Sequence, residues 1–416
     1  MSKSLSSNQI CWRQVFSLAA VQGSMSLAWI AYNIYLPKFI EQVFAYSNND
    51  AQKLTALILV IESAIGLVVE PFFGSLSDRL QRLYGSKVPF ILVSAIGSTL
   101  LLMGLPCIVI FGGSNAVTQS LLLGLAILWS IVMATFRSPV LSLLGNLSTA
   151  NQLPLAAAAL TVVGGLVAAI KPLATDFIMS LGAPLTFAIS SITFLICLAS
   201  LRSTMMQLPK AVKTDLEPME SWSIIAFLKS ISLVLWVGAM LGLGTKLLMS
   251  DLIPRILKAD ITAFTGLSFE TCLGLILITQ ALFAIGTGKV SQFIPNRILM
   301  IISLGTISAG LGLWSLNMGA IGSVIILLLI LMGLSAVNNG MVPFALTMVP
   351  KSLSGLIVGV FFGGMSGAIA LLGYLVPKSA TMLSTSGSIL ITTIVFLFAG
   401  LGIALGLRIA VKTSRC

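Results

Sequence analysis

The chain has 416 residues, of which 57% are hydrophobic and only 8% are charged, and its mean hydropathy is +1.07. A water-soluble domain of this composition would expose large apolar patches, so the sequence predicts a polytopic membrane protein. The net charge of +11 is spread along the chain without a compact basic domain, which excludes a nucleic-acid-binding protein.

Apolar windows of about 20 residues, long enough to cross roughly 30 Å of hydrocarbon, recur along the whole chain. They predict an all-α fold with twelve transmembrane helices. Because the apolar runs are continuous rather than alternating, a membrane β-barrel is excluded. The expected spans are residues 14–39, 54–74, 88–111, 119–142, 154–178, 184–202, 230–254, 264–287, 297–316, 321–347, 353–376 and 387–408.

The first span has no small-residue cleavage site, so it is predicted to be retained rather than removed as a signal peptide. An even number of spans places both termini on one side of the membrane. With cytoplasmic termini, sixteen of the 23 Lys and Arg residues lie at or near the cytoplasmic face. We therefore expect a multi-pass protein of the plasma or inner membrane, surrounded by the lipid bilayer.

Residues 74–89, GSLSDRLQRLYGSKVP, are the longest strongly polar stretch of the first half and are expected to form a tight cytoplasmic loop. Gly74 would let the second helix approach a neighbour closely, and Asp78 can accept hydrogen bonds from free N–H groups at a helix N-terminus. The expected target is the start of the eleventh helix, near residues 352–355. This arrangement predicts a cytoplasmic latch, formed by Gly74, Asp78, Arg79 and Arg82. The alternative is a plain positively charged loop with a helix-capping Asp.

The chain divides near its middle into two six-helix halves, residues 1–202 and 223–416, joined by a polar cytoplasmic linker at 203–222. An internal repeat supports duplication, because VGGLVAAI at 163–170 aligns with FGGMSGAI at 362–369. The first helix of each half is expected to close on a proline followed by a basic residue. These are Pro37 with Lys38 and Pro254 with Arg255.

Two six-helix halves, a long linker and a G-x-x-x-D-R pattern between helices 2 and 3 resemble the major facilitator superfamily of secondary transporters. The spacing from Ser77, Asp78 and Arg79 to Gly85 and Pro89 is similar to that of the sucrose-transporter-like and glycoside cation-symporter branches. The corresponding loop of the second half, GTGKVSQFIPNR, lacks an acidic residue. The resemblance implies alternating access, a small-molecule substrate and a coupled proton or sodium ion, and we expect a monomer.

Ionisable residues deep in a bilayer are costly and mark a pathway or an ion pair. Counting 1.5 Å per residue places four of them in one layer, roughly 9 to 12 Å below the outer surface. The four are Glu62, Lys171, Lys246 and Glu270. In the arrangement that the resemblance implies, Lys171 and Glu270 face each other between the halves. Glu62 is the first candidate for the coupling carboxylate, whereas Glu270 and Lys246 have the alternative of reaching the water interface.

A second charged layer is expected near the cytoplasm, where Glu70 on helix 2 and Arg137 on helix 4 come within reach. They form either a charge relay with the latch or a structural pair. Uncharged polar residues on helices 1 and 10 are candidates for the substrate cavity, with hydrogen bonding between helices as the alternative. The cavity candidates are Gln22, Tyr32, Asn33, Asn338 and Asn339.

The chain has no His and only twelve Asp and Glu residues, which excludes a zinc set, a His-based triad and a carboxylate-rich metal cluster. It also lacks a G-x-x-x-x-G-K-[ST] phosphate loop, and hence a sign of ATP-driven transport. We therefore expect no enzyme activity and no cofactor beyond the coupling ion. The predicted function is import of a sugar-like or other small polar solute. Alternatives are efflux of amphipathic compounds, a membrane enzyme or lipid-handling protein, and a transporter-derived receptor or scaffold.

Overall fold

A computed structural model describes residues 10–206, 224–316, 319–375 and 384–413 of the chain. Within these ranges, 12 helices are long and apolar enough to cross a membrane, and no strand is present. The all-α prediction is confirmed.

The first six spanning helices are α1 (Trp12–Phe44), α2 (Asn48–Tyr84), α3 (Val88–Gly112), α4 (Ala116–Ser142), α5 (Leu153–Leu181) and α6 (Ala183–Met205). The seventh span is a continuous helix of 42 residues, Ile224–Thr265. It comprises α7 (Ile224–Leu247), α8 (Ile253–Ile256) and α9 (Thr262–Thr265), joined by π-helical turns. The last five are α10 (Phe269–Val290), α11 (Asn296–Trp314), α12 (Gly319–Leu346), α13 (Ser354–Leu375) and α14 (Thr385–Thr413).

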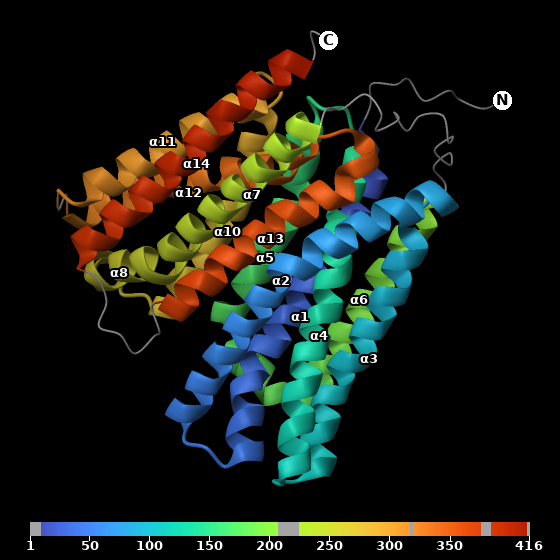
Figure 1. The fold of residues 1–416 in the computed structure, drawn as a ribbon. Helices are drawn as coiled ribbons and strands as arrows, with labels where there is room; N and C mark the ends of the chain where they lie inside the picture. Colours follow the sequence, from blue (N-terminus) through green and yellow to red (C-terminus); the bar gives the residue numbers. More distant parts are fainter. Residues whose placement is uncertain (1–9, 207–223, 317–318, 376–383, 414–416) are drawn as a thin grey trace.

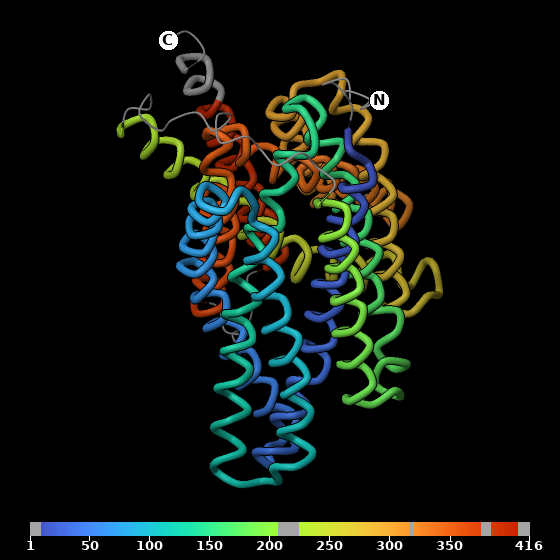
Figure 2. Tube along the Cα trace, turned by 90° about the vertical axis from the view of Figure 1, so that its right-hand side faces the viewer, coloured from blue at the N-terminus to red at the C-terminus, as the bar shows by residue number. Residues whose placement is uncertain are grey.

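The twelve spans form two six-helix bundles, drawn from blue to green and from yellow to red in Figure 1. The beginning of α1 and the end of α14 lie at the same end of the molecule, which we name the termini side; the opposite end is the far side. Helix α2 packs against α13, and α5 packs against α10, across the two halves. The helix axes of the halves diverge toward the far side in Figure 1, and α3 and α4 reach furthest in that direction in Figures 1 and 2.

Helix α2 is longer than predicted, because residues 74–84 continue it instead of forming a loop. Leu76, Leu80 and Leu83 keep the helical spacing of apolar residues beyond Gly74. The helix ends only at Gly85, whose φ of 76° is left-handed and whose N–H bonds to the Gln81 carbonyl. The expected latch residues therefore lie on a rigid helix, and the connection to α3 is reduced to a few residues.

Pro37 and Pro254 do not end their helices, contrary to the prediction. Helix α1 continues past Pro37 to Phe44, and the seventh span continues past Pro254 to Thr265. A proline removes one backbone hydrogen bond, and the π-helical turns Leu248–Leu252 and Leu257–Ile261 flank Pro254. Of the expected linker at 203–222, residues 207–222 lie outside the described ranges.

Candidate functional site

Asp78, near the end of α2, bonds to the first turn of α13 in the other half. Its Oδ1 accepts from the Gly355 N–H at 2.9 Å and its Oδ2 accepts from the Leu356 N–H at 2.8 Å. These N–H groups are free because a helix leaves its first turn without intrahelical acceptors, and the helix dipole favours a negative charge there. The contact that the sequence placed between Asp78 and the start of the eleventh helix is present.

The cation beside Asp78 is Lys87, which lies just before α3. Its Nζ is 2.5 Å from Asp78 Oδ1, and it also donates to Ser142 Oγ at 2.8 Å and to Ser354 Oγ at 3.0 Å. Lys87 is 1% exposed. Burial lowers the pKa of its ammonium group, and the neighbouring Asp78 carboxylate opposes that shift. We name Asp78, Lys87, Ser142, Ser354 and the N–H groups of Gly355 and Leu356 the Asp78 cluster.

Arg79 and Arg82, which were expected to belong to the latch, are exposed side chains outside this cluster. Adjacent positions on a helix point about 100° apart, so Arg79 cannot face the same neighbour as Asp78. The left-handed Gly85 turns the chain back at the end of α2 and brings Lys87 to Asp78 instead.

Gly74 lies where the backbones of α2 and α13 meet. A Cβ atom added there would overlap the Gly355 carbonyl, and one added at Gly359 would overlap the Glu70 carbonyl. Gly363 lies against the Leu67 carbonyl, one turn further along the same face of α13. Glycines spaced by four residues thus allow a backbone contact that a larger residue would block.

A second polar layer lies deeper along α2. Glu70, 2% exposed, receives a bond from Arg137 Nη1 at 3.3 Å, as predicted from the sequence. The Arg137 guanidinium also lies 4.3 Å from the ring centroid of Phe362 on α13. Arg137 therefore contacts both halves, through an ion pair in its own half and a cation–π contact in the other.

Glu62 lies on α2, one layer further toward the far side, and is 8% exposed. The Tyr32 hydroxyl on α1 donates to Glu62 Oε1. Tyr32 packs on Trp129 with ring centroids 4.4 Å apart, and Trp129 packs on Trp29 at 4.8 Å. Glu62 Oε2 and Trp129 Nε1 are buried and have no hydrogen-bond partner among the described residues.

These four side chains, which we name the Glu62 site, combine an acceptor, a donor and aromatic faces. The sequence indicated Glu62 and Tyr32 but gave no reason to choose Trp29 or Trp129, because tryptophans are common in apolar helices.

The other expected charges of the outer layer are exposed. Lys171 precedes Pro172 at a kink of α5, Lys246 lies at the end of α7 and Glu270 lies in the first turn of α10. The Lys171 and Glu270 side chains are both exposed, and the pairing expected between them stays a prediction. Their helices, α5 and α10, pack against each other.

Of the expected cavity residues, some form hydrogen bonds within the protein and others have polar groups without a described partner. Asn339 Nδ2 donates to the Ala284 carbonyl at 2.9 Å and to Thr287 Oγ1 at 3.0 Å, which joins α12 to α10 within one half. The Asn33 amide donates to the Trp29 carbonyl of its own helix at 2.8 Å. These two amides therefore form hydrogen bonds within the protein, which was the alternative to a role in the substrate cavity. Asn338 is half-buried, and Gln22 Oε1 is buried without a hydrogen-bond partner among the described residues.

Among the described residues, no three His, Cys, Asp or Glu side chains gather as a metal ion would require. No protein-family model matches the chain. No curated protein sequence matches it either.

Solved structures do resemble it. An outward-facing bacterial homologue of the iron transporter ferroportin superposes with a TM-score of 0.68 and 17% identity, over 97% of this chain and 100% of that one. The same protein type soaked with iron gives a TM-score of 0.69 and 16% identity, over 94% and 98%. The human organic anion transporter MFSD10 gives 0.67 and 14%, over 95% and 100%. The chain therefore has the fold of these solved structures, with two six-helix bundles.

Proposed function

We propose that this protein is a secondary active transporter that carries a small organic solute by alternating access, with its termini side facing the cytoplasm. The observation that carries the proposal is the Asp78 cluster. It joins the two halves through a few buried polar bonds on one side of the membrane, where a rocking motion of the halves must break them. The transporter neighbours share this fold, and their substrates are properties of those proteins.

The Glu62 site is the proposed coupling site. A carboxylate buried in the membrane is costly as an anion, so it takes up a proton or a cation when it is not paired. Glu62, Glu70 and Asp78 follow one another at eight-residue intervals on α2, which is about 12 Å of helix between successive acids. Movement of this single helix would therefore connect the charge state of Glu62 with the Glu70 layer and the Asp78 cluster.

The proposed substrate is a polar solute with hydroxyl groups, as in a sugar. Such a group can donate to Glu62 Oε2 and accept from Trp129 Nε1, while the aromatic rings cover the apolar face of the solute. The aromatic surface around Trp29 favours amphipathic compounds as the second candidate class. We place the protein in the plasma or inner membrane, with a proton or sodium ion as the coupled ion.

Transport in proteoliposomes tests this function. A thermal-shift screen with sugars, glycosides, organic anions and hydrophobic cations selects the solute, and flux is then driven by a pH or sodium gradient. We expect Glu62→Gln to abolish pH-driven uptake and to leave solute exchange, because a glutamine mimics the protonated acid but cannot release the proton. Glu41→Gln is the matched control, since Glu41 is partly exposed and pairs with Lys38 of its own helix.

Unchanged pH-driven uptake in Glu62→Gln would remove Glu62 as the coupling residue. Absence of flux for every solute that stabilises the protein, under both gradients, would overturn the transporter assignment.

A further inference from the structure

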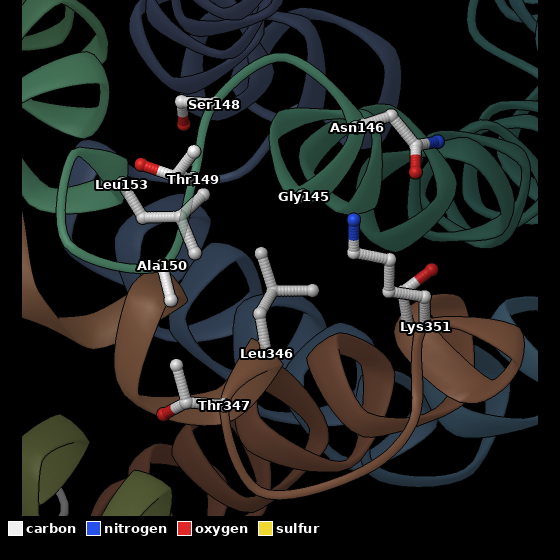
Figure 3. Close-up of a pocket in the computed structure, with 10 residues that line it drawn as sticks. Gly145, Asn146, Ser148, Thr149, Ala150, Leu153, Leu346, Thr347 and Lys351 are labelled. Carbon is white, nitrogen blue, oxygen red and sulfur yellow. The ribbon is translucent and has the colours of Figure 1, made fainter. Parts of the chain in front are cut away.

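A pocket of about 300 Å³ lies between the halves on the termini side (Figure 3). One wall is the α4–α5 connection and the other is the α12–α13 connection. It is lined by Gly145, Asn146, Ser148, Thr149, Ala150, Leu153, Leu346, Thr347, Lys351 and Ser354. None of these residues is acidic, and Asn146, Thr149 and Lys351 are exposed, so the pocket is open to solvent on this side.

The two walls are equivalent segments of the internal repeat. The offset of 199 residues that aligns 163–170 with 362–369 also aligns Ser148 with Thr347 and Gln152 with Lys351. The pocket therefore lies where the two repeats meet. The main chemical difference between the two repeats here is that Lys351 stands where the first repeat has Gln152. The wall formed by the α12–α13 connection therefore carries a positive charge.

The pocket is suited to an anion. Figure 3 shows the Lys351 amine directed toward Gly145 and Asn146 on the opposite wall, and no described residue forms an ion pair with it. Ser148 Oγ is buried and has no hydrogen-bond partner among the described residues. Two further cations touch the lining: Arg297 Nη2 is 3.5 Å from Thr347 Oγ1, and Lys87 Nζ is 3.0 Å from Ser354 Oγ.

We propose that this pocket binds a phosphomonoester group, carried by a small soluble compound or by an acidic lipid. A phosphomonoester presents several acceptor oxygens, which an ammonium group and hydroxyl groups on two facing walls can bond from different directions. The volume exceeds that of inorganic phosphate and accommodates a phosphate with a few carbon atoms.

Occupancy of the pocket stabilises the closed termini side. The ligand touches both halves, and the lining residue Ser354 is itself bonded to Lys87 of the Asp78 cluster. A ligand that contacts both walls loses half of its contacts when the walls separate, so it favours the closed state. This consequence rests on alternating access, whereas the binding itself does not.

Binding to the purified full-length protein tests the proposal. Glycerol 3-phosphate and inorganic phosphate are titrated at constant ionic strength, with chloride as the reference anion. We expect glycerol 3-phosphate to bind, and Lys351→Gln and Ser148→Ala each to weaken it, Lys351→Gln by about tenfold or more because a charge-assisted bond is lost. Lys289→Gln, an exposed lysine near the end of α10 that does not line the pocket, is the matched control and should bind as the unaltered protein does.

A lipid arm distinguishes the two sources of the phosphate. In nanodiscs, we compare the stability of the protein with phosphatidic acid and with phosphatidylcholine. A gain in stability with phosphatidic acid that is lost in Lys351→Gln assigns the site to a lipid headgroup. Stabilisation only by glycerol 3-phosphate assigns it to a soluble ligand. Ala150→Trp, which fills the pocket and keeps Lys351, should abolish either effect.

If glycerol 3-phosphate binds equally to the unaltered protein and to Lys351→Gln, the proposed site is wrong. It is also wrong if neither the two phosphate compounds nor phosphatidic acid binds. Because this assay needs no transport, its failure is distinguishable from failure of the proposed function. Reduced affinity in Asp78→Asn would support the link to the closed state, and unchanged affinity there would refute that link.

Discussion

Asp78→Asn should open the termini side. The carboxylate accepts two backbone bonds from α13 and pairs with Lys87, and both side chains are almost fully buried. The amide keeps one neutral acceptor and leaves the Lys87 ammonium buried without a counter-charge. Removing one partner of a buried ion pair costs about 3 to 5 kcal/mol. If the open state exposes Lys87 to water, this cost falls on the closed state alone, and the closed-to-open ratio drops by about 10² to 5 × 10³.

Distances between spin labels measure that ratio. Ser203, exposed near the end of α6, and Gln292, exposed just after α10, lie on opposite halves at the termini side and can carry the labels once the native cysteines are replaced. We expect a longer distance in Asp78→Asn and no change in Asp50→Asn, whose acid is exposed at the start of α2.

Adding Lys87→Met to Asp78→Asn removes both charges and should return the ratio to within about tenfold of the unaltered protein, because replacing a complete buried pair is often nearly neutral. If the double variant stays as open as Asp78→Asn alone, or if Asp78→Asn stays closed, the ion-pair reasoning is wrong.

Two further predictions use the same labels. Gly359→Ala should also open the termini side, because its Cβ would overlap the Glu70 carbonyl and overpacking costs about 1 to 3 kcal/mol; Gly286→Ala, which has open space around it, should not. The pKa of Lys87 lies below its ordinary value of 10.5 in the closed state, so the open state, with Lys87 in water, binds more protons between that lowered pKa and 10.5. Raising the pH through this window should therefore increase the closed fraction, and the variant lacking both charges should lose this dependence. A closed fraction that falls with rising pH would contradict it.

The sequence was sufficient for contacts that depend on the ends and lengths of helices. The number of spans, the contact of Asp78 with α13 and the Glu70–Arg137 pair all follow from counting residues along apolar runs. The sequence was not sufficient where a contact depends on the rotation of one helix about its axis, or on the relative height of two helices in the membrane. Whether Lys171 and Glu270 pair depends in this way on the relative height of α5 and α10, which apolar composition does not define, so this pair stays a prediction.

Lys87 was missed for a different reason. The polar run at 74–89 was interpreted as a loop because it is polar, although its leucines keep helical spacing up to Leu83. With the end of α2 placed ten residues too early, the predicted latch included Arg79 and Arg82 and did not include Lys87. The signal that identifies Lys87 is the distance of two residues from a helix-ending glycine, which returns the chain over the last turn of α2.

The described structure distributes its charges unequally between the two sides, and this bears on how the halves move. On the termini side, the Asp78 cluster and Arg137 contact both halves and are largely buried. On the far side, the described ion pairs Lys38–Glu41, Asp50–Lys53 and Asp251–Arg255 each lie within one helix. Separation on the far side therefore breaks none of these pairs, whereas separation on the termini side must break the Asp78 cluster. Under the proposed alternating access, the resting state would then be closed on the termini side, and tighter binding of the proposed substrate and coupling ion to the other state would supply the free energy that opens it.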